Sequence, residues 1–148
     1  MKYIFKIGLV IGIVLIAIGV DSRDKADLAK PSESSTTKKV KFDTPKFTKY
    51  TLKKELVKRN IKHDSIVFAQ ARLETGNFKS YLFKKHNNLF GFRGKKGYIE
   101  YNHWTESVAA YKRFQDKYYK GGDYYTFLKD RGYAEDPDYI NKVRSCVN

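Results

Sequence analysis

The sequence predicts an α+β fold that is mainly helical and carries one small β-hairpin. Apolar side chains recur at helical spacing through most of the C-terminal two thirds of the chain. One stretch, residues 92–101, combines a glycine-containing turn with residues that favour strands. Glycines and prolines separate these segments. With 148 residues, the chain is long enough for one domain and its appendages.

The N-terminus has the composition of a targeting segment. Lys2 and Lys6 precede or flank an uncharged run of 14 residues, Ile7–Val20, which is shorter than the ~20 apolar residues of a spanning helix. This favours a signal peptide at residues 1–20, with small residues at Ala17–Gly19 for cleavage. The alternative is an uncleaved signal anchor, because Tyr3–Phe5 could extend the apolar span. We therefore expect export to the cell envelope, either secreted or periplasmic after cleavage or anchored in the membrane.

Residues 21–46 are predicted to form a flexible polar linker. This stretch contains Pro31 and Pro45 and shows no sustained apolar periodicity. Its apolar side chains are too few to offset the conformational entropy that ordering would cost. The folded domain is therefore expected to span residues 47–148.

Three helices are expected at the start of this domain. The first covers residues 52–60, where apolar residues share one face. The second covers residues 66–75 and is so rich in apolar residues that we expect it to be largely buried. A short helix over residues 79–85 follows. The residues that cap or stop the first two helices are Thr51 for the first, Asp64 or Ser65 for the second, and Gly76 at the end of the second.

Turn residues and periodicity predict the remaining elements. Gly94–Gly97 marks the turn of a hairpin, and the residues that follow it up to Tyr101 favour a strand. Thr105 starts a long helix, with apolar residues at helical spacing up to Tyr118. The last two helices are expected over residues 124–131, capped by Asp123 and closed by Gly132, and from Asp136–Pro137 onward.

Three motifs, in this order, carry a resemblance to a known family. Gln70–Ser80 places Glu74 at the end of an apolar helix, just before a glycine. Asn87–Phe92 contains Asn-Leu-Phe-Gly, and Gly132–Tyr139 contains a Tyr-Ala pair. Across residues 51–143 the ordered set resembles the glucosaminidase-type peptidoglycan hydrolases, the lysozyme-like muramidase and N-acetylglucosaminidase group.

The resemblance implies a lysozyme-like domain with a groove between its helices and its hairpin. It implies a glycosidase that cleaves β-1,4 bonds in peptidoglycan glycan strands, as an endo-N-acetylglucosaminidase or a muramidase-like enzyme. The alternative is a non-catalytic wall-binding or structural module on the same fold. The chain has 12 tyrosines and 10 phenylalanines, and those not needed in the core could stack on sugar faces.

Glu74 is the predicted proton donor. Cleaving a glycosidic bond needs an acid that is still protonated near neutral pH, so the pKa of its carboxyl must be raised. The negative end of the helix dipole and burial against an apolar helix face both raise it. Arg72 and Lys79 would oppose this rise if they lay close. The family's helix-terminal glutamate, which a small residue and a glycine follow, corresponds to Glu74.

The second catalytic group is harder to assign. The resemblance implies a partner carboxylate on a longer hairpin lobe, which in this chain is cut to the acid-free turn Gly94–Gly97. Glu100, on the returning strand, is the nearest candidate. Glu106 is next, although the start of a helix favours a carboxylate on structural grounds alone. Otherwise the N-acetyl group or 6-hydroxyl of the substrate replaces the second carboxylate.

Three further residues are expected to bind substrate. Asn88, in the Asn-Leu-Phe-Gly motif, can bond either the backbone or substrate amides. The Tyr133 hydroxyl could orient a sugar N-acetyl group or a water, and the other interpretation is a buried aromatic at a helix end. Tyr101 is expected at the edge of the cleft, whereas the neighbouring Trp104 is expected to pack in the core.

Composition argues against several other functions. The single cysteine, Cys146, excludes an intrachain disulfide. The three histidines are not spaced like a zinc site and there is no phosphate-binding glycine loop, so we predict no metal and no cofactor. The net charge of +14 favours an anionic wall polymer or a membrane surface as a partner, and export argues against nucleic acid. We expect a monomer.

Overall fold

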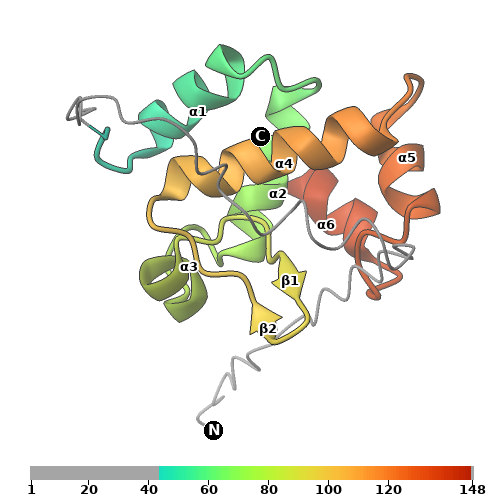
Figure 1. Cartoon of the computed structure of the whole chain (residues 1–148). Helices are drawn as coiled ribbons and strands as arrows, with labels where there is room; N and C mark the ends of the chain where they lie inside the picture. The colour runs from blue at the N-terminus through green and yellow to red at the C-terminus, as the bar shows by residue number, and fades with distance from the viewer. Residues whose placement is uncertain (1–43, 148) are drawn as a thin grey trace, which may run out of the picture.

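The structure is a computed structural model that describes residues 44–147, so the expected targeting segment and most of the linker lie outside the described residues. Within that range it holds six helices and one two-stranded antiparallel sheet (Figure 1). The elements are α1 (Lys49–Lys58), α2 (Asp64–Glu74), α3 (Tyr81–His86), β1 (Arg93–Gly94), β2 (Gly97–Tyr98), α4 (Trp104–Tyr118), α5 (Tyr124–Asp130) and α6 (Tyr139–Ser145). The mainly helical α+β class is confirmed. No helix in the described part is long and apolar enough to cross a bilayer.

The first helix, α1, begins three residues earlier than predicted. Its N-cap is Thr48, whose hydroxyl accepts from the Thr51 N–H at 2.9 Å. In return, the Thr51 hydroxyl accepts from the Thr48 N–H at 2.8 Å. The prediction that Thr51 is the cap was therefore wrong, because Thr51 is the inner partner of a capping box. Leu52 and Leu56 are buried as expected, but Val57 is 65% exposed.

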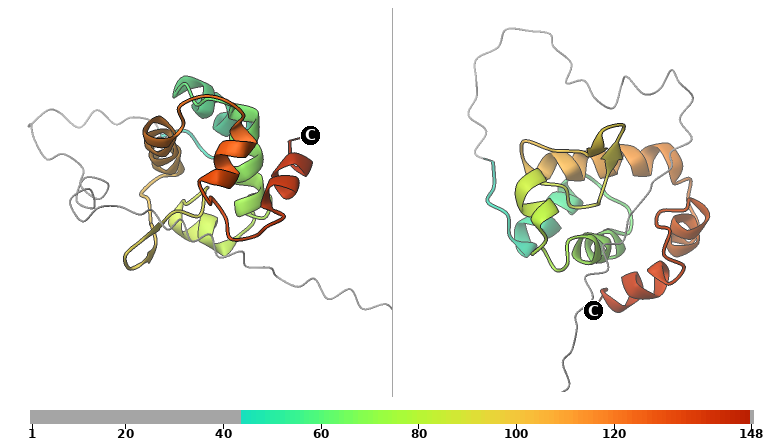
Figure 2. Two further views of the ribbon diagram at one scale, coloured as in Figure 1. Left: turned by 90° about the vertical axis from the view of Figure 1, so that its right-hand side faces the viewer. Right: turned by 90° about the horizontal axis from the view of Figure 1, so that it is seen from below.

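The central helix of the fold is α2. It contacts both α1 and α6, and Figure 2 shows α6 on the side of α2 that faces away from α4. Val67, Ala69 and Ala71 are completely buried, which confirms the expected burial of this helix. The expected cap was wrong, because α2 begins at Asp64 and the cap position is His63, a left-handed residue with φ 54° and no side-chain cap.

The helices α3 and α4 begin close to their predicted starts. Ser80 caps α3, with its hydroxyl accepting from the Phe83 N–H at 3.2 Å, so α3 starts at Tyr81 instead of residue 79. His103 caps α4, so α4 starts at Trp104, one residue before the expected Thr105. Both caps are side-chain acceptors that satisfy N–H groups of the first helical turn.

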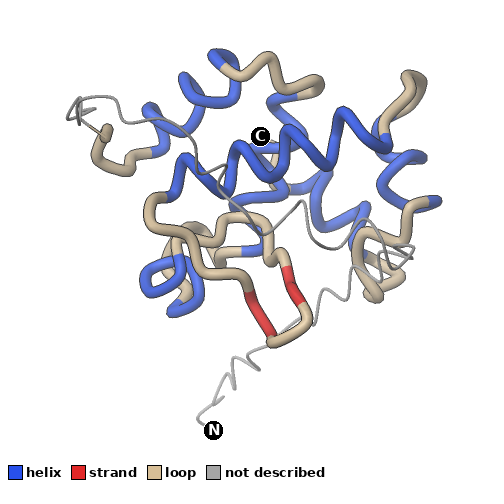
Figure 3. Tube along the Cα trace, in the orientation of Figure 1, coloured by secondary structure: helices blue, strands red, loops and turns tan. Residues whose placement is uncertain are grey.

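The hairpin confirms the predicted turn but not the predicted strand length. Gly94 pairs with Gly97, and each strand has only two residues. Figure 3 shows these short strands at the end of long loops. The strand predicted to continue from Tyr98 to Tyr101 was wrong, because the Tyr101 N–H bonds to the His86 carbonyl of α3 at 2.9 Å.

The last two helices differ in how well their starts were predicted. The Asp123 carboxylate accepts from the Thr126 N–H at 2.7 Å, which confirms Asp123 as the cap of α5. The helix predicted to open at Asp136–Pro137 begins instead at Tyr139. The Asp136 carboxylate accepts from the Asp138 N–H at 2.9 Å, which forms a turn before α6.

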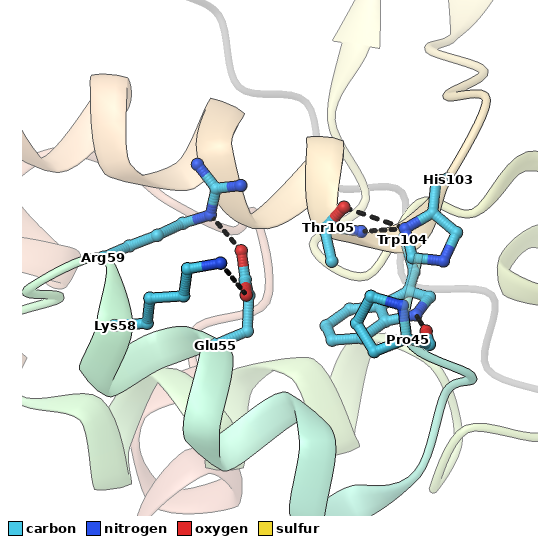
Figure 4. A network of polar contacts seen from close by, with 7 residues as sticks. All are labelled: Pro45, Glu55, Lys58, Arg59, His103, Trp104 and Thr105. Atoms are coloured by element: carbon cyan, nitrogen blue, oxygen red, sulfur yellow. Dashed lines mark hydrogen bonds and ion pairs between the residues drawn. The ribbon is translucent and has the colours of Figure 1, made fainter. Parts of the chain in front are cut away.

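The first described residues are fixed to the domain. The Trp104 indole N–H donates to the Pro45 carbonyl at 2.9 Å beside α1 (Figure 4). Trp104 is 2% exposed, which confirms its place in the core. In the same view the buried Glu55 carboxylate accepts from Arg59 at 2.6 Å. The Pro45 carbonyl, in the stretch that we assigned to the linker, is therefore held by a residue of the core.

Candidate active site

The position of Glu74 at the end of α2 is held by the turn that follows it. The Thr75 hydroxyl donates to the Ala71 carbonyl at 2.6 Å and accepts from the Phe78 N–H at 2.9 Å. Gly76 has φ 53°, in the left-handed region that strains a residue with a side chain. A Cβ at Gly76 would meet nothing within 4 Å, so the backbone conformation and not the space demands glycine.

Glu74 as a whole is half-buried, but the Oε1 atom of its carboxyl is fully buried. Its Oε1 atom has no hydrogen-bond partner among residues 44–147. Burial raises the pKa of Glu74 from 4.5 to about 7, because the charged form loses its hydration. A hydrogen bond from Tyr139 lowers this pKa and so opposes part of the rise. Neither Arg72 nor Lys79 is among the causes of the shift. Burial therefore acts in the direction that we predicted.

Three buried tyrosines lie near enough to this carboxyl for its charge to affect their pKa values. The rings of Tyr133 and Tyr139 stack with centroids 5.6 Å apart, and the ring of Tyr111 lies 6.4 Å from that of Tyr133. Burial raises the pKa of each phenol well above its usual value, and the Glu74 charge adds to each rise. They come from α4, from the connection between α5 and α6, and from α6, so only the tertiary structure brings them together.

Gln70 and Tyr139 are site residues that the sequence analysis missed. Gln70 is completely buried, and its Nε2 donates to the Tyr139 hydroxyl at 3.0 Å. A signal for Gln70 was present, because it lies four residues before Glu74 on the same face of a largely apolar helix. Tyr139 ends the third motif, Gly132–Tyr139, but we gave it no role in the site.

Tyr133 and Tyr101, both predicted to bind substrate, differ in hydrogen bonding. Tyr133 is 1% exposed, and its hydroxyl donates to the Phe90 carbonyl at 3.2 Å, which agrees with the buried-aromatic alternative. The Tyr101 hydroxyl is buried without a hydrogen-bond partner in the described part of the chain. Burial raises the pKa of Tyr101 to about 12, with Arg113 lowering it and Glu106 raising it. The Tyr101 hydroxyl is therefore the freer of the two to meet a ligand.

Asn88 holds the start of the hairpin. It is 1% exposed, and its Nδ2 donates to the carbonyls of Phe92 at 2.8 Å and Ile99 at 2.9 Å. Its Oδ1 accepts from the N–H groups of Phe90 at 3.4 Å and Phe92 at 3.1 Å. The amide is thus occupied by backbone groups. Of the two roles weighed for Asn88, the geometry supports the structural one.

Neither candidate for the second acid lies against Glu74. The Glu100 side chain is 66% exposed, and its Oε2 lies 3.3 Å from Nδ1 of His86. The Glu106 Oε2 accepts from the Asn102 N–H at 3.1 Å, as a contact at the start of α4. The shift in the pKa of Glu74 comes from burial and from Tyr139, and neither Glu100 nor Glu106 contributes to it.

The surroundings of Glu74 contain no evident metal site. No group of three or more His, Cys, Asp or Glu side chains among residues 44–147 is placed to hold a metal ion. Two shallow depressions lie elsewhere, one on α1 around Tyr50 and one beside Phe127 where α4 connects to α5. The groove expected between the hairpin and the helices is not one of these two depressions.

A buried carboxylic acid that keeps its proton near neutral pH is the arrangement expected of the proton donor in a glycosidase. The Glucosaminidase family, described as mannosyl-glycoprotein endo-beta-N-acetylglucosaminidase, matches residues 49–148, and the chain belongs to this family. The domain is therefore of a glycosidase kind, and the substrate class that the family implies is a glycan. No curated protein and no solved structure matches the chain.

Proposed function

We propose that this protein hydrolyses β-1,4 glycosidic bonds in the glycan strands of peptidoglycan, as an endo-N-acetylglucosaminidase or muramidase-like enzyme. The observation that carries the proposal is the buried Glu74 carboxyl, with an unpaired Oε1 and a pKa of about 7. Family membership supports the reaction class. The lysozyme-like arrangement implied by the sequence motifs is part of the same proposal, and the mainly helical domain with its small sheet supports it.

In the proposed reaction, Glu74 gives its proton to the glycosidic oxygen. The bond between that oxygen and the anomeric carbon breaks, and its electron pair stays on the leaving oxygen. A water then attacks the anomeric carbon and releases a proton, which returns the Glu74 carboxylate to its acid form. A pKa of about 7 suits both proton transfers, because the group can give up and regain a proton near neutral pH.

The positive charge that develops on the sugar needs a second group. Glu100 could supply it only if substrate or a loop movement brought the exposed carboxylate toward the bond. The substrate's own N-acetyl group needs no such movement, so we favour a mechanism with Glu74 as the single protein acid. Tyr101, with its buried and unpaired hydroxyl, is the residue that we propose to orient the sugar or the water.

Glu74→Gln tests the proposal directly. It removes the transferable proton at nearly constant volume, and loss of a general acid reduces turnover by ~10²–10⁴-fold. Glu135→Gln, at an exposed position, is the matched control and should keep full activity. The assay is release of fragments from purified peptidoglycan, with mass spectrometry of the new ends to identify the bond cut. Wild-type turnover in Glu74→Gln would refute the assignment.

The alternative function is a wall-binding module without turnover. The observation in its favour is that the described structure puts no second carboxylate beside Glu74. This alternative predicts that wild-type protein sediments with purified walls but releases no fragments. Equal binding by wild type and Glu74→Gln, with no fragments from either, would establish it.

We also propose that residues 1–20 direct export and that the basic domain is attracted to the anionic envelope. The net charge of +14 supports this attraction. Cell fractionation should find the full-length product at the membrane or outside it. A cytoplasmic pool that retains its N-terminus would contradict the proposal.

A further inference from the structure

A continuous series of hydrogen bonds crosses the core and ends at Tyr139, the tyrosine whose hydroxyl interacts with the Glu74 carboxyl. Its members are buried polar side chains that come from four helices, and each bonds to the next. In order, they are Gln115 of α4, Tyr124 of α5, Tyr111 of α4, Gln70 of α2 and Tyr139 of α6. Five polar side chains in one apolar core are costly to bury unless each is satisfied, so the order of donors and acceptors decides what the series can do.

The far end is anchored by the backbone. The Lys62 N–H donates to Oε1 of Gln115 at 2.7 Å, and Nε2 of Gln115 donates to the Lys62 carbonyl at 2.8 Å. If the Gln115 amide were turned over, Nε2 would face the Lys62 N–H, donor against donor. Oε1 would then face the Lys62 carbonyl, acceptor against acceptor. The amide orientation is therefore fixed, and its second Nε2 hydrogen goes to the Tyr124 hydroxyl at 2.9 Å.

This anchor gives the whole series one direction. The Tyr111 hydroxyl donates its only proton to Oε1 of Gln70 at 2.5 Å. In the 2.8 Å contact between the two phenols, Tyr124 must then be the donor and Tyr111 the acceptor. Nε2 of Gln70 donates onward to the Tyr139 hydroxyl at 3.0 Å. Every proton in the series therefore points toward α6.

At the near end, one proton is left for Glu74. The Tyr139 oxygen already accepts from Gln70 at 3.0 Å. The interaction between Tyr139 and the Glu74 carboxyl lowers the pKa of Glu74 and raises that of Tyr139, which is the pattern of a phenol donating to a carboxylate. A phenol has a single proton, so Tyr139 donates it to that carboxyl. We propose that the series is a device that positions Glu74, in which Gln70 and Tyr139 hold the carboxyl and stabilise its ionised form after its proton has left.

Burial has the larger effect on the ionisation of Glu74, and Tyr139 is the donor that opposes it. From the other elements, the titratable groups that face it are Tyr111, Tyr133 and Tyr139, all neutral near pH 7 because burial raises their pKa well above its usual value. On α2 itself, the guanidinium of Arg72 donates to the Cys146 carbonyl at 2.8 Å. Tyr133 donates to the Phe90 carbonyl and so lies outside the series.

The test is a direct titration of Glu74 in the full-length protein without substrate. Carboxyl-labelled glutamate gives one carbon signal for each of six glutamates, and Glu74→Gln identifies the Glu74 signal by its loss.

Tyr139→Phe removes the donor and should raise the pKa of Glu74 by about one pH unit, the effect of losing one hydrogen bond to a charged group. Gln70→Met should raise it less, because Tyr139 then remains but loses the amide that polarises it. Tyr119→Phe is the control, because its hydroxyl bonds to the Gly122 carbonyl at 2.6 Å and to Nε2 of His63 at 2.7 Å, both outside the series, so that the pKa of Glu74 should not change.

A Glu74 pKa that is unchanged in folded Tyr139→Phe overturns the inference, and so does an equal rise in Tyr119→Phe. If Tyr139→Phe is not recovered folded, Gln70→Met decides by the same criterion, because it keeps the side-chain length. The catalytic meaning of the device rests on the proposed function, but the titration does not. A wild-type chain inactive on peptidoglycan would refute the proposed function and leave the titration result standing. An active chain with an unshifted pKa in the variants would refute the device alone.

Discussion

Replacing Glu74 by glutamine should stabilise the domain above neutral pH while it removes the proposed proton donor. The folded-state pKa of Glu74 is about 7, against 4.5 for the unperturbed group. A group whose pKa is raised on folding favours the folded state while it is protonated. Its contribution is fully present below pH 4.5 and is lost as the pH rises through 7. Above that pH, the folded protein must hold a buried charge that glutamine does not have.

The size of the effect follows from the two pKa values. Each pH unit between them corresponds to about 1.4 kcal/mol of unfolding free energy. The stabilisation of Glu74→Gln relative to wild type should therefore be larger by about 3 kcal/mol at pH 8 than at pH 4. At pH 6 most of the gain, about 2 kcal/mol, should already be present. The fixed effects of the amide are the same at every pH and cancel in this comparison.

Urea unfolding followed by circular dichroism at pH 4, 6 and 8 measures these differences. Glu135→Gln is the control, because an exposed glutamate should give a nearly constant difference from wild type. A constant difference for Glu74→Gln as well would show that burial does not raise the pKa of this carboxyl. If the free energy of unfolding of the wild type rose relative to that of Glu74→Gln between pH 4 and pH 8, the sign of the effect would be reversed. That result would refute the reasoning even more directly.

Three further outcomes follow from the same geometry. Turnover on peptidoglycan should fall as the pH rises above about 7, since Glu74 then loses its proton, and a rate that is constant up to pH 9 would argue against this acid. Glu100→Gln should lower turnover far less than Glu74→Gln, because its carboxylate is exposed, and equal losses in two folded variants would make Glu100 a true catalytic partner. Asn88→Ala should lower the free energy of unfolding by roughly 2 kcal/mol or more, measured by urea unfolding, because it strips buried backbone groups at the hairpin of their partners. An unchanged unfolding midpoint would instead free Asn88 for a role in binding substrate.

Local patterns were sufficient for the elements whose ends depend on neighbouring residues. Gly76 stops α2 because only glycine adopts its left-handed conformation without strain, and this puts Glu74 in the last turn. Asp123 caps α5 with its own side chain, and Gly94–Gly97 closes the hairpin. Thr51 shows the limit of such patterns, because a second threonine one turn earlier, Thr48, took the cap position.

The chemistry of the site depended on contacts between residues far apart in the sequence. The sequence by itself determined that a glutamate ends an apolar helix and that its pKa should rise. Only the tertiary structure decided which groups meet that carboxyl, because Tyr139 reaches it from α6 and Gln70 is oriented through Tyr111 and the anchored Gln115. Burial and the direction of a hydrogen bond are properties of several packed segments at once, so no spacing along one segment specifies them.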